Sequence, residues 1–147
     1  MSLKDWLSNG WLTEHRTGPR EIRDLFHVVD RDISECQSPG LSADWKLNIA
    51  YNAALQAATA ALAAAGYRAG RQAHHYRTIQ SLAHTIKADA DLVAQFDQFR
   101  KKRNIGGYER VGVISDQEAE EMLSLARSLR KEAEKWIQKE YPTLLDT

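Results

Sequence analysis

The chain has 147 residues, a length typical of one domain, and its 20 Lys and Arg are balanced by 20 Asp and Glu. Hydrophobic residues make up 43% and charged residues 27%, with only three prolines, so the composition excludes a disordered or collagen-like chain. The formal net charge of zero also excludes a generically basic nucleic-acid binder.

Cysteine content and hydropathy favour a cytoplasmic protein. The single cysteine, Cys36, cannot close an intrachain disulfide, and the chain does not start with the basic and then apolar pattern of a signal peptide. The longest apolar-looking run, Ala43 to Ala65, contains charged and amide side chains and is mostly alanine. We therefore expect no membrane-spanning helix and no contact with a membrane.

Residues 1–17 are predicted to form an N-terminal arm with a short amphipathic helix. Trp6 and Trp11 are its apolar anchors, and Gly10 is expected to end the helix. The pattern leaves open whether this arm docks on its own bundle or on a second subunit.

Residues 18–147 are predicted to form a helical bundle. Its first helix opens at Gly18-Pro19, because proline is favoured at the first helical position, and ends at Ser38-Pro39-Gly40. The second helix begins after the capping residue Ser42 and ends at Gly66. Eleven alanines lie in it on nearly every face, which is typical of a central helix that its neighbours approach closely.

Three further helices complete the predicted bundle. The third begins near Arg71 and turns at Asp89, and the fourth runs from there to Gly106-Gly107. A capping box at Ser115 and Glu118 opens the fifth. The third helix has its buried side marked by Ile79, Leu82, Ala83 and Ile86. No segment has the pattern of a strand, so we predict an all-α, antiparallel up-and-down bundle of about five helices.

Positive charge is concentrated in the middle of the chain. Between Arg68 and Arg110, Lys and Arg outnumber Asp and Glu by nine to four. Arg103 lies 4 and 7 residues after Phe99 and Phe96, so helical spacing places it on the apolar stripe. A guanidinium in that position needs an acceptor, either inside the protein or on an external phosphate.

A second cluster of basic and aromatic side chains opens the third helix. His75 precedes Asp89 by 14 residues and Arg103 follows it by 14, so an antiparallel pair of helices brings the two to the same level. Such groups could bind an anion or perform acid–base chemistry on a phosphodiester. The cluster comprises Arg71, His74, His75, Tyr76 and Arg77.

Simpler interpretations of the same residues are also open. Basic residues at the end of a helix stabilise its dipole, and paired histidines at a helix start are commonly solvated. Tyr51 and Asn52, among the alanines, fit a core or interface role, and Cys36 fits an inert core. The motif Asp24-x-x-His27 stands alone, so we expect no metal and no cofactor.

Three segments together resemble the HEPN superfamily over roughly residues 18 to 140. They are Asn-Ile-Ala-Tyr-Asn-Ala-Ala-Leu-Gln-Ala from Asn48, Gly-Tyr-Arg followed by His-His-Tyr, and Arg-Lys-Lys-Arg-Asn-x-x-x-Tyr from Arg100. The resemblance implies a helical bundle that pairs as a homodimer. Many members are metal-independent ribonucleases with an Arg-x(4–6)-His motif. Others bind RNA or a nucleotide, or serve as partners of minimal nucleotidyltransferases in toxin–antitoxin pairs.

The resemblance also assigns individual residues. The family's arginine falls on Arg103 and its polar neighbour on Asn104, but Tyr108 occupies the position of the family's histidine. Because a phenol with a pKa near 10 is a poor general base at neutral pH, we expect weak or no nuclease activity. The predicted function is a module that binds RNA or a nucleotide or partners a nucleotidyltransferase. The resemblance implies a toxin–antitoxin system as its setting.

The predicted binding residues are Arg71, His74, His75, Arg100 and Arg103. The alternative function is a metal-independent ribonuclease that uses Arg103, Asn104 and Tyr108, with His75 as a further candidate. The third possibility is an interaction scaffold, in which the basic residues at the start of the third helix and at the end of the fourth are merely solvated.

Overall fold

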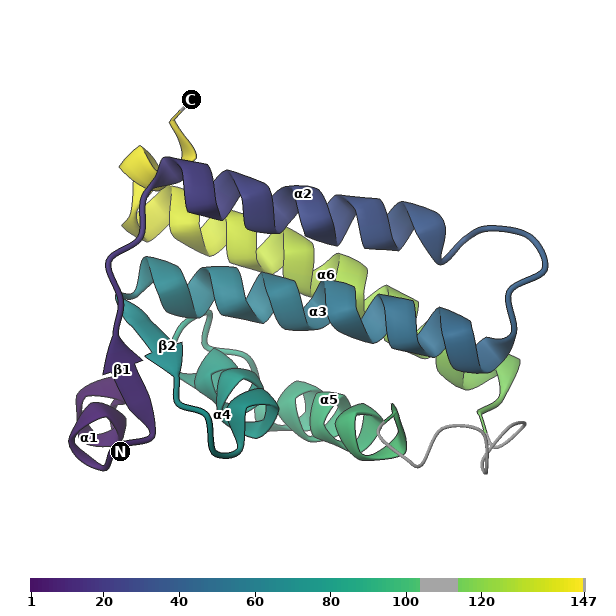
Figure 1. Cartoon of the computed structure of the whole chain (residues 1–147), viewed down its shortest axis with the longest axis horizontal. Coiled ribbons are helices and arrows are strands. Elements are labelled where there is room, and N and C mark those ends of the chain that lie inside the picture. The colour runs from purple at the N-terminus through teal and green to yellow at the C-terminus, as the bar shows by residue number, and fades with distance from the viewer. Residues whose placement is uncertain (104–113, 147) are drawn as a thin grey trace.

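A computed structural model describes residues 1–103 and 114–146 of the chain, and most of them are helical. Three long helices, α2 (Pro19–Glu35), α3 (Ala43–Ala64) and α6 (Asp116–Glu140), run alongside one another (Figure 1). The short 3₁₀ helix η3 (Pro142–Leu145) follows α6. The predicted helical bundle is confirmed by this arrangement.

Helix α3 is the centre of the bundle, and it packs mainly against α6 and α2. Most of its buried side chains are alanines, among them Ala50, Ala53, Ala57 and Ala61, each 0% exposed. Because the alanine side chain is small, neighbouring helices approach the α3 backbone closely. The Ser42 hydroxyl caps the helix by accepting a hydrogen bond from the Trp45 amide at 3.2 Å. Both sequence predictions for α3, its cap and its central position, are confirmed.

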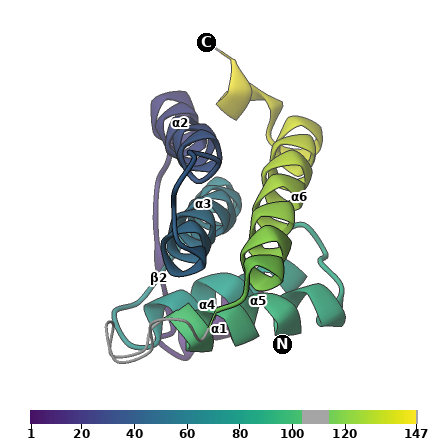
Figure 2. The same ribbon diagram turned by 90° about the vertical axis from the view of Figure 1, so that its right-hand side faces the viewer.

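Two shorter helices, α4 (His74–Gln80) and α5 (Ala90–Arg103), lie across one side of the three long ones (Figure 2). The predicted third helix is too long, because α4 gives way to the 3₁₀ helix η1 (Ser81–Ala83) before Ile86. Ser81 Oγ donates to the Thr78 carbonyl at 2.6 Å, and Thr85 Oγ1 donates to the Ser81 carbonyl at 3.3 Å. Such hydroxyls compete with helical hydrogen bonds, which accounts for the early end.

The prediction that the chain contains no strand pair is wrong. Strand β1 (Leu12–Glu14) pairs antiparallel with β2 (Tyr67–Ala69). Each strand has only three residues, too few for the alternation that identifies a strand in a sequence. Gly66, with φ +99°, turns the chain from α3 into β2 in a backbone conformation that favours glycine.

The N-terminal arm folds onto the chain's own bundle. It comprises α1 (Leu3–Ser8), the turn at Gly10 and strand β1. Trp6 is only 7% exposed and packs in one cluster with Leu12 and with Leu62 of α3. Arg77 of α4 lies over the Trp11 ring, with its Cζ 3.7 Å from the ring centroid. The arm thus packs against both α3 and α4.

The last long helix begins as predicted. Ser115 Oγ accepts from the Glu118 amide at 3.0 Å, and the Ser115 amide donates to the Glu118 carboxylate at 3.1 Å, which completes the capping box. The predicted helix stop at Gly106-Gly107 lies outside the described residues. Across residues 1–103 and 114–146, no helix is both long and apolar enough to cross a membrane.

Candidate functional site

Arg103 ends helix α5 with its side chain turned inward. It is half-buried, and its Cζ lies 4.6 Å from the centroid of the Tyr51 ring on α3. Phe96 and Phe99, on the same stripe of α5, are buried, as the helical spacing predicts. The Arg103 Nε atom is buried and has no hydrogen-bond partner within the described part of the chain.

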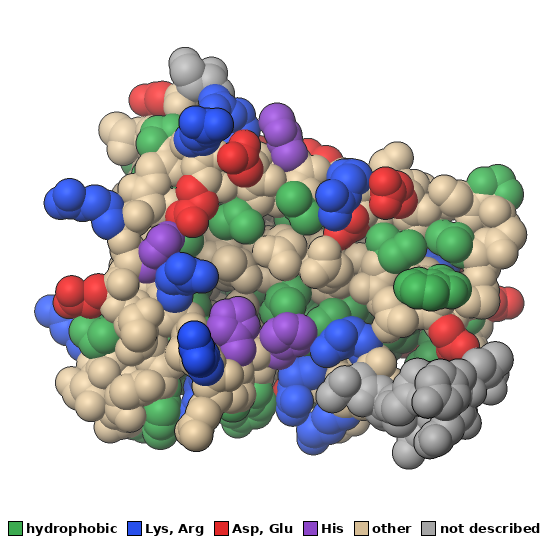
Figure 3. Space-filling view, in the orientation of Figure 1, with side chains coloured by type: hydrophobic (Ala, Val, Ile, Leu, Met, Phe, Trp, Pro, Cys, Tyr) green, Lys and Arg blue, Asp and Glu red, His purple; other side chains and the backbone are tan. Residues whose placement is uncertain are grey.

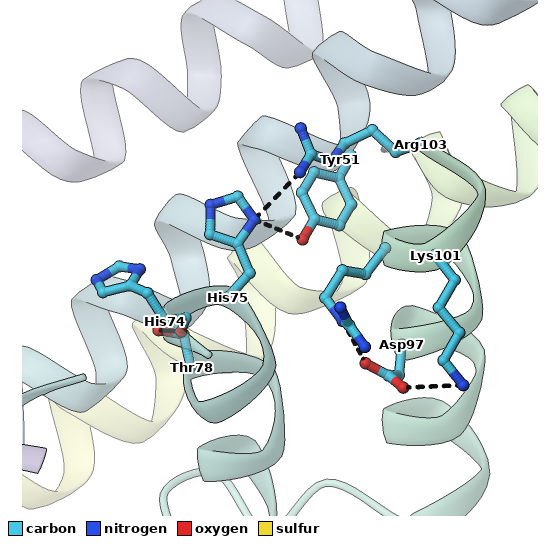
Figure 4. Close-up of polar contacts among 8 residues, drawn as sticks. Tyr51, His74, His75, Thr78, Asp97, Lys101 and Arg103 are labelled. Atoms are coloured by element: carbon cyan, nitrogen blue, oxygen red, sulfur yellow. Dashed lines mark hydrogen bonds and ion pairs between the residues drawn. The ribbon is translucent and has the colours of Figure 1, made fainter. Parts of the chain in front are cut away.

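His75 connects Arg103 with Tyr51. Its Nδ1 atom lies 3.1 Å from the Tyr51 hydroxyl oxygen and 3.4 Å from Arg103 Nη2. Figure 4 shows the three side chains converging from α3, α4 and α5 (Figure 4). The predicted juxtaposition of His75 and Arg103 is therefore confirmed. We call Tyr51, His75 and Arg103 the triad.

Burial decides the protonation of the triad. It raises the pKa of Tyr51 to about 12, although the positive charge of Arg103 acts in the opposite direction. Burial, followed by the charge of Arg103, lowers the pKa of His75 below its ordinary value. At neutral pH the triad therefore contains a protonated phenol, a neutral imidazole and one guanidinium cation.

The contacts also indicate which nitrogen of His75 is protonated. Arginine can only donate, so Nδ1 beside Arg103 Nη2 serves as an acceptor and the proton belongs on Nε2. In this tautomer the imidazole presents an N–H donor to its surroundings. The arrangement suits the binding of an anion better than the abstraction of a proton.

The other cations at the end of α5 have carboxylate partners. Arg100 Nε lies 2.6 Å from Asp97 Oδ1, and Lys101 Nζ lies 3.7 Å from Asp97 Oδ2. Lys102 forms an ion pair with Glu118 of α6. Arg103 has no carboxylate partner among residues 1–103 and 114–146, and Figure 4 shows Lys101 turned away from it toward Asp97.

The triad lines a pocket of about 400 Å³ that is bounded by α2, α3, α4, the end of α5 and the strand pair. His74 lines the pocket as well. Arg68 of β2 and His15, which directly follows β1, also belong to its lining. Among the described residues of its lining, Glu21 is the one acidic side chain, and this carboxylate accepts hydrogen bonds from His15 and Thr17. Figure 3 shows histidine, lysine and arginine side chains gathered on this face of the molecule (Figure 3). The pocket is therefore predominantly basic.

The predicted site residues do not all reach this pocket. His74, His75 and Arg103 line it. Arg71 is exposed and is not part of its lining, and Arg100 is directed to Asp97 and to the Tyr76 ring, 5.5 Å away. The remaining two candidates, Asn104 and Tyr108, lie outside the described residues.

Tyr51, His15 and Arg68 contribute to the pocket although the sequence does not predict them as site residues. The sequence predicts a core or interface role for Tyr51, and this side chain is only 1% exposed. A phenol among alanines still needs a hydrogen-bond partner, and this requirement was the available signal. His15 and Arg68 carry no such signal, because the strand pair alone brings them to the pocket.

No group of three or more His, Cys, Asp and Glu side chains within the described ranges is arranged to hold a metal ion. No protein-family model, curated protein or solved structure matches the chain.

Proposed function

We propose that this protein is a HEPN-like module that binds single-stranded RNA or a nucleotide through a phosphate held at Arg103. One observation carries the proposal. Arg103 is half-buried against Tyr51 and has no carboxylate partner in the described part of the chain, whereas Arg100, Lys101 and Lys102 are all paired. A buried guanidinium is costly without an acceptor, and phosphate oxygens match its fork geometry.

The rest of the triad supports the same function. Neutral His75 offers an N–H donor, and the protonated Tyr51 contributes a ring face against which the guanidinium lies at 4.6 Å. His74 and Arg68 line the same pocket and add donors for a phosphodiester. The pocket therefore has the charge and the hydrogen-bond donors that a phosphate requires.

A second candidate function is metal-independent RNA cleavage. It is favoured by the contact of 3.4 Å between His75 and Arg103, since an imidazole beside a phosphate-binding arginine could transfer a proton. This reaction would require Nε2 of His75 to act, because Nδ1 is already engaged by Tyr51 and Arg103. Binding without efficient cleavage remains our preferred proposal.

The assembly that we propose rests on the family resemblance. It is a homodimer in the cytoplasm that partners a minimal nucleotidyltransferase within a toxin–antitoxin pair. The identity of the neighbouring gene and the mass of the protein in solution test these two parts separately.

Arg103→Ala and Lys101→Ala form a matched pair for the binding test. Both remove one positive charge from the last turn of α5, but only Arg103 faces the pocket. We expect Arg103→Ala to weaken binding of a short labelled single-stranded RNA by about tenfold or more, as for a lost charge-assisted hydrogen bond. Lys101→Ala should weaken it by less than about threefold, because that contact is exposed.

Fluorescence anisotropy across a range of salt concentrations measures the affinity of both variants for the RNA. Thermal unfolding is the control for folding. Affinity should fall as salt rises, since phosphate contacts release counterions. Equal losses in the two variants would indicate a diffuse basic surface and would refute a specific site at Arg103.

A further inference from the structure

Helix α3 presents a row of carboxamide side chains to the pocket. Asn48, Asn52 and Gln56 are four residues apart, so they lie one above another on a single helix face. All three are half-buried, and all three line the same pocket as the triad. The function proposed above, which concerns the phosphate, makes no use of them.

A carboxylate fixes the orientation of two of these amides. Asn52 Nδ2 donates to Asp32 Oδ2 at 2.7 Å, and Gln56 Nε2 donates to Asn52 Oδ1 at 3.3 Å. Asp32 is only 5% exposed and forms an ion pair with Arg31. Because a carboxylate only accepts, Asn52 must direct its NH₂ group to Asp32 and its oxygen toward Gln56.

The chain of hydrogen bonds leaves a defined set of groups available at Gln56. The Gln56 oxygen has no donor within residues 1–103 and 114–146, and one of its N–H groups is also unused there. The Asn48 amide forms no side-chain hydrogen bond within the same ranges. An oriented pair of acceptor and donor matches the edge of a nucleobase, which offers a donor and an acceptor side by side.

The pocket also provides a surface for the flat face of a base. Tyr67 of β2 is half-buried and lines the pocket together with Leu55 and Leu62. Aromatic side chains of this kind stack on bases in single-stranded RNA. The volume of about 400 Å³ is within the range of small-ligand pockets, which is roughly 300–1,000 Å³.

From these observations we infer that the pocket binds a complete nucleotide unit, with its phosphate at Arg103 and its base recognised by Gln56 and Asn48. Asn52 and Asp32 are positioning residues, since they orient the Gln56 amide. The inference rests on the proposed function, because it requires a phosphate at Arg103. It adds that the base contributes to affinity.

The test compares a six-nucleotide single-stranded RNA with an abasic oligomer of the same length and phosphate number. We expect the wild-type protein to bind the RNA about tenfold more tightly, the discrimination typical of one good bidentate contact. Gln56→Ala and Asn48→Ala should each reduce this ratio toward one while leaving the affinity for the abasic oligomer unchanged. Arg103→Ala should lower the affinity for both oligomers by the same factor.

Gln138→Ala, an exposed amide on α6 outside the pocket, is the matched control. Asn48→Ala removes no side-chain hydrogen bond within residues 1–103 and 114–146, so it keeps the test valid if Gln56→Ala disturbs folding. If the wild type binds both oligomers with equal affinity, and Arg103→Ala loses the binding of both, base recognition is overturned and phosphate binding is supported. Binding of neither oligomer by the folded wild type would overturn both.

Discussion

At the scale of single residues, the three side chains of the triad come from three different helices, and different contacts hold each of them in place. Tyr51 is held by the alanine core of α3, and His75 lies at the start of α4, where both side chains meet Arg103. Neither Tyr51 nor His75 carries charge at neutral pH, because burial opposes ionisation of both. The single charge of the triad is therefore the guanidinium of Arg103.

His75 predicts a pH dependence of stability. Since its pKa is lowered in the folded protein, the unfolded chain binds a proton more readily. Stability should therefore be fully present above the ordinary histidine pKa of about 6.5 and decline as pH falls through it toward the lower folded value. Urea unfolding should show that the free energy of unfolding falls more between pH 7.5 and pH 5.5 in the wild type than in His75→Asn.

The difference between these two proteins isolates His75. The pKa of His84 is also lowered by burial, but that residue is present in both proteins and its contribution cancels. An identical pH dependence for the wild type and His75→Asn would contradict the prediction.

Catalysis is the second prediction at the residue scale. We expect the wild type to cleave RNA slowly or not at all in EDTA, because a positioned acid or base is typically worth about 10²–10⁴-fold. Cleavage assays should include Tyr108→His, His74→Ala and His75→Ala. Gain of activity in Tyr108→His alone would identify the protein as a lapsed nuclease. Robust wild-type cleavage that disappears in His75→Ala would instead establish the ribonuclease alternative.

At the scale of elements, the strand pair is a minor part of the fold with a direct effect on the site. Leu12 pairs with Ala69 and Glu14 pairs with Tyr67, and the His15 amide then donates to the Gly66 carbonyl at 2.8 Å. This register brings His15 and Arg68 to the pocket that α3 and α4 begin. Trp6 secures the strand pair by packing against Leu62.

Trp6→Ala tests the role of the arm. Trp6 is only 7% exposed, so its truncation should reduce the free energy of unfolding by about 3–5 kcal/mol. Trp6→Phe keeps an aromatic ring in the same cluster, so its free energy of unfolding should fall clearly less than that of Trp6→Ala. Chemical denaturation measures both variants, and a loss below about 1 kcal/mol for Trp6→Ala would show that the arm contributes little to stability.

At the scale of the whole molecule, three large hydrophobic side chains among residues 1–103 and 114–146 are exposed: Met1, Trp45 and Tyr141. Trp45, in the first turn of α3, is 63% exposed, while the alanines further along the helix are buried. Exposed aromatic residues are enriched where proteins associate. This exposure and the family resemblance favour the proposed homodimer.

Light scattering at micromolar concentration tests the dimer. We expect a species of twice the chain mass of 16.7 kDa, and a shift toward the monomer in Trp45→Ser. A single wild-type species of 16.7 kDa would refute the dimer.

Much of the architecture follows from signals that lie within a few residues of each other. The caps at Ser42 and Ser115, the alanine content of α3 and the apolar stripe of α5 are all local, and the helices that they predict are present. Counting equal distances from Asp89 also predicts that His75 lies beside Arg103. The structure has this contact, although α4 ends at Gln80 and the 3₁₀ helix η1 lies between α4 and α5.

The composition of the pocket depends on contacts that no local pattern encodes. Tyr51 meets His75 across 24 residues, and β1 meets β2 only because the arm returns to the end of α3. Strands of three residues carry no periodic signal, and the direction in which a buried phenol points depends on how the helices pack. Local hydrogen bonding and hydrophobic spacing thus determined the helices, whereas packing between distant segments decided which side chains share the pocket.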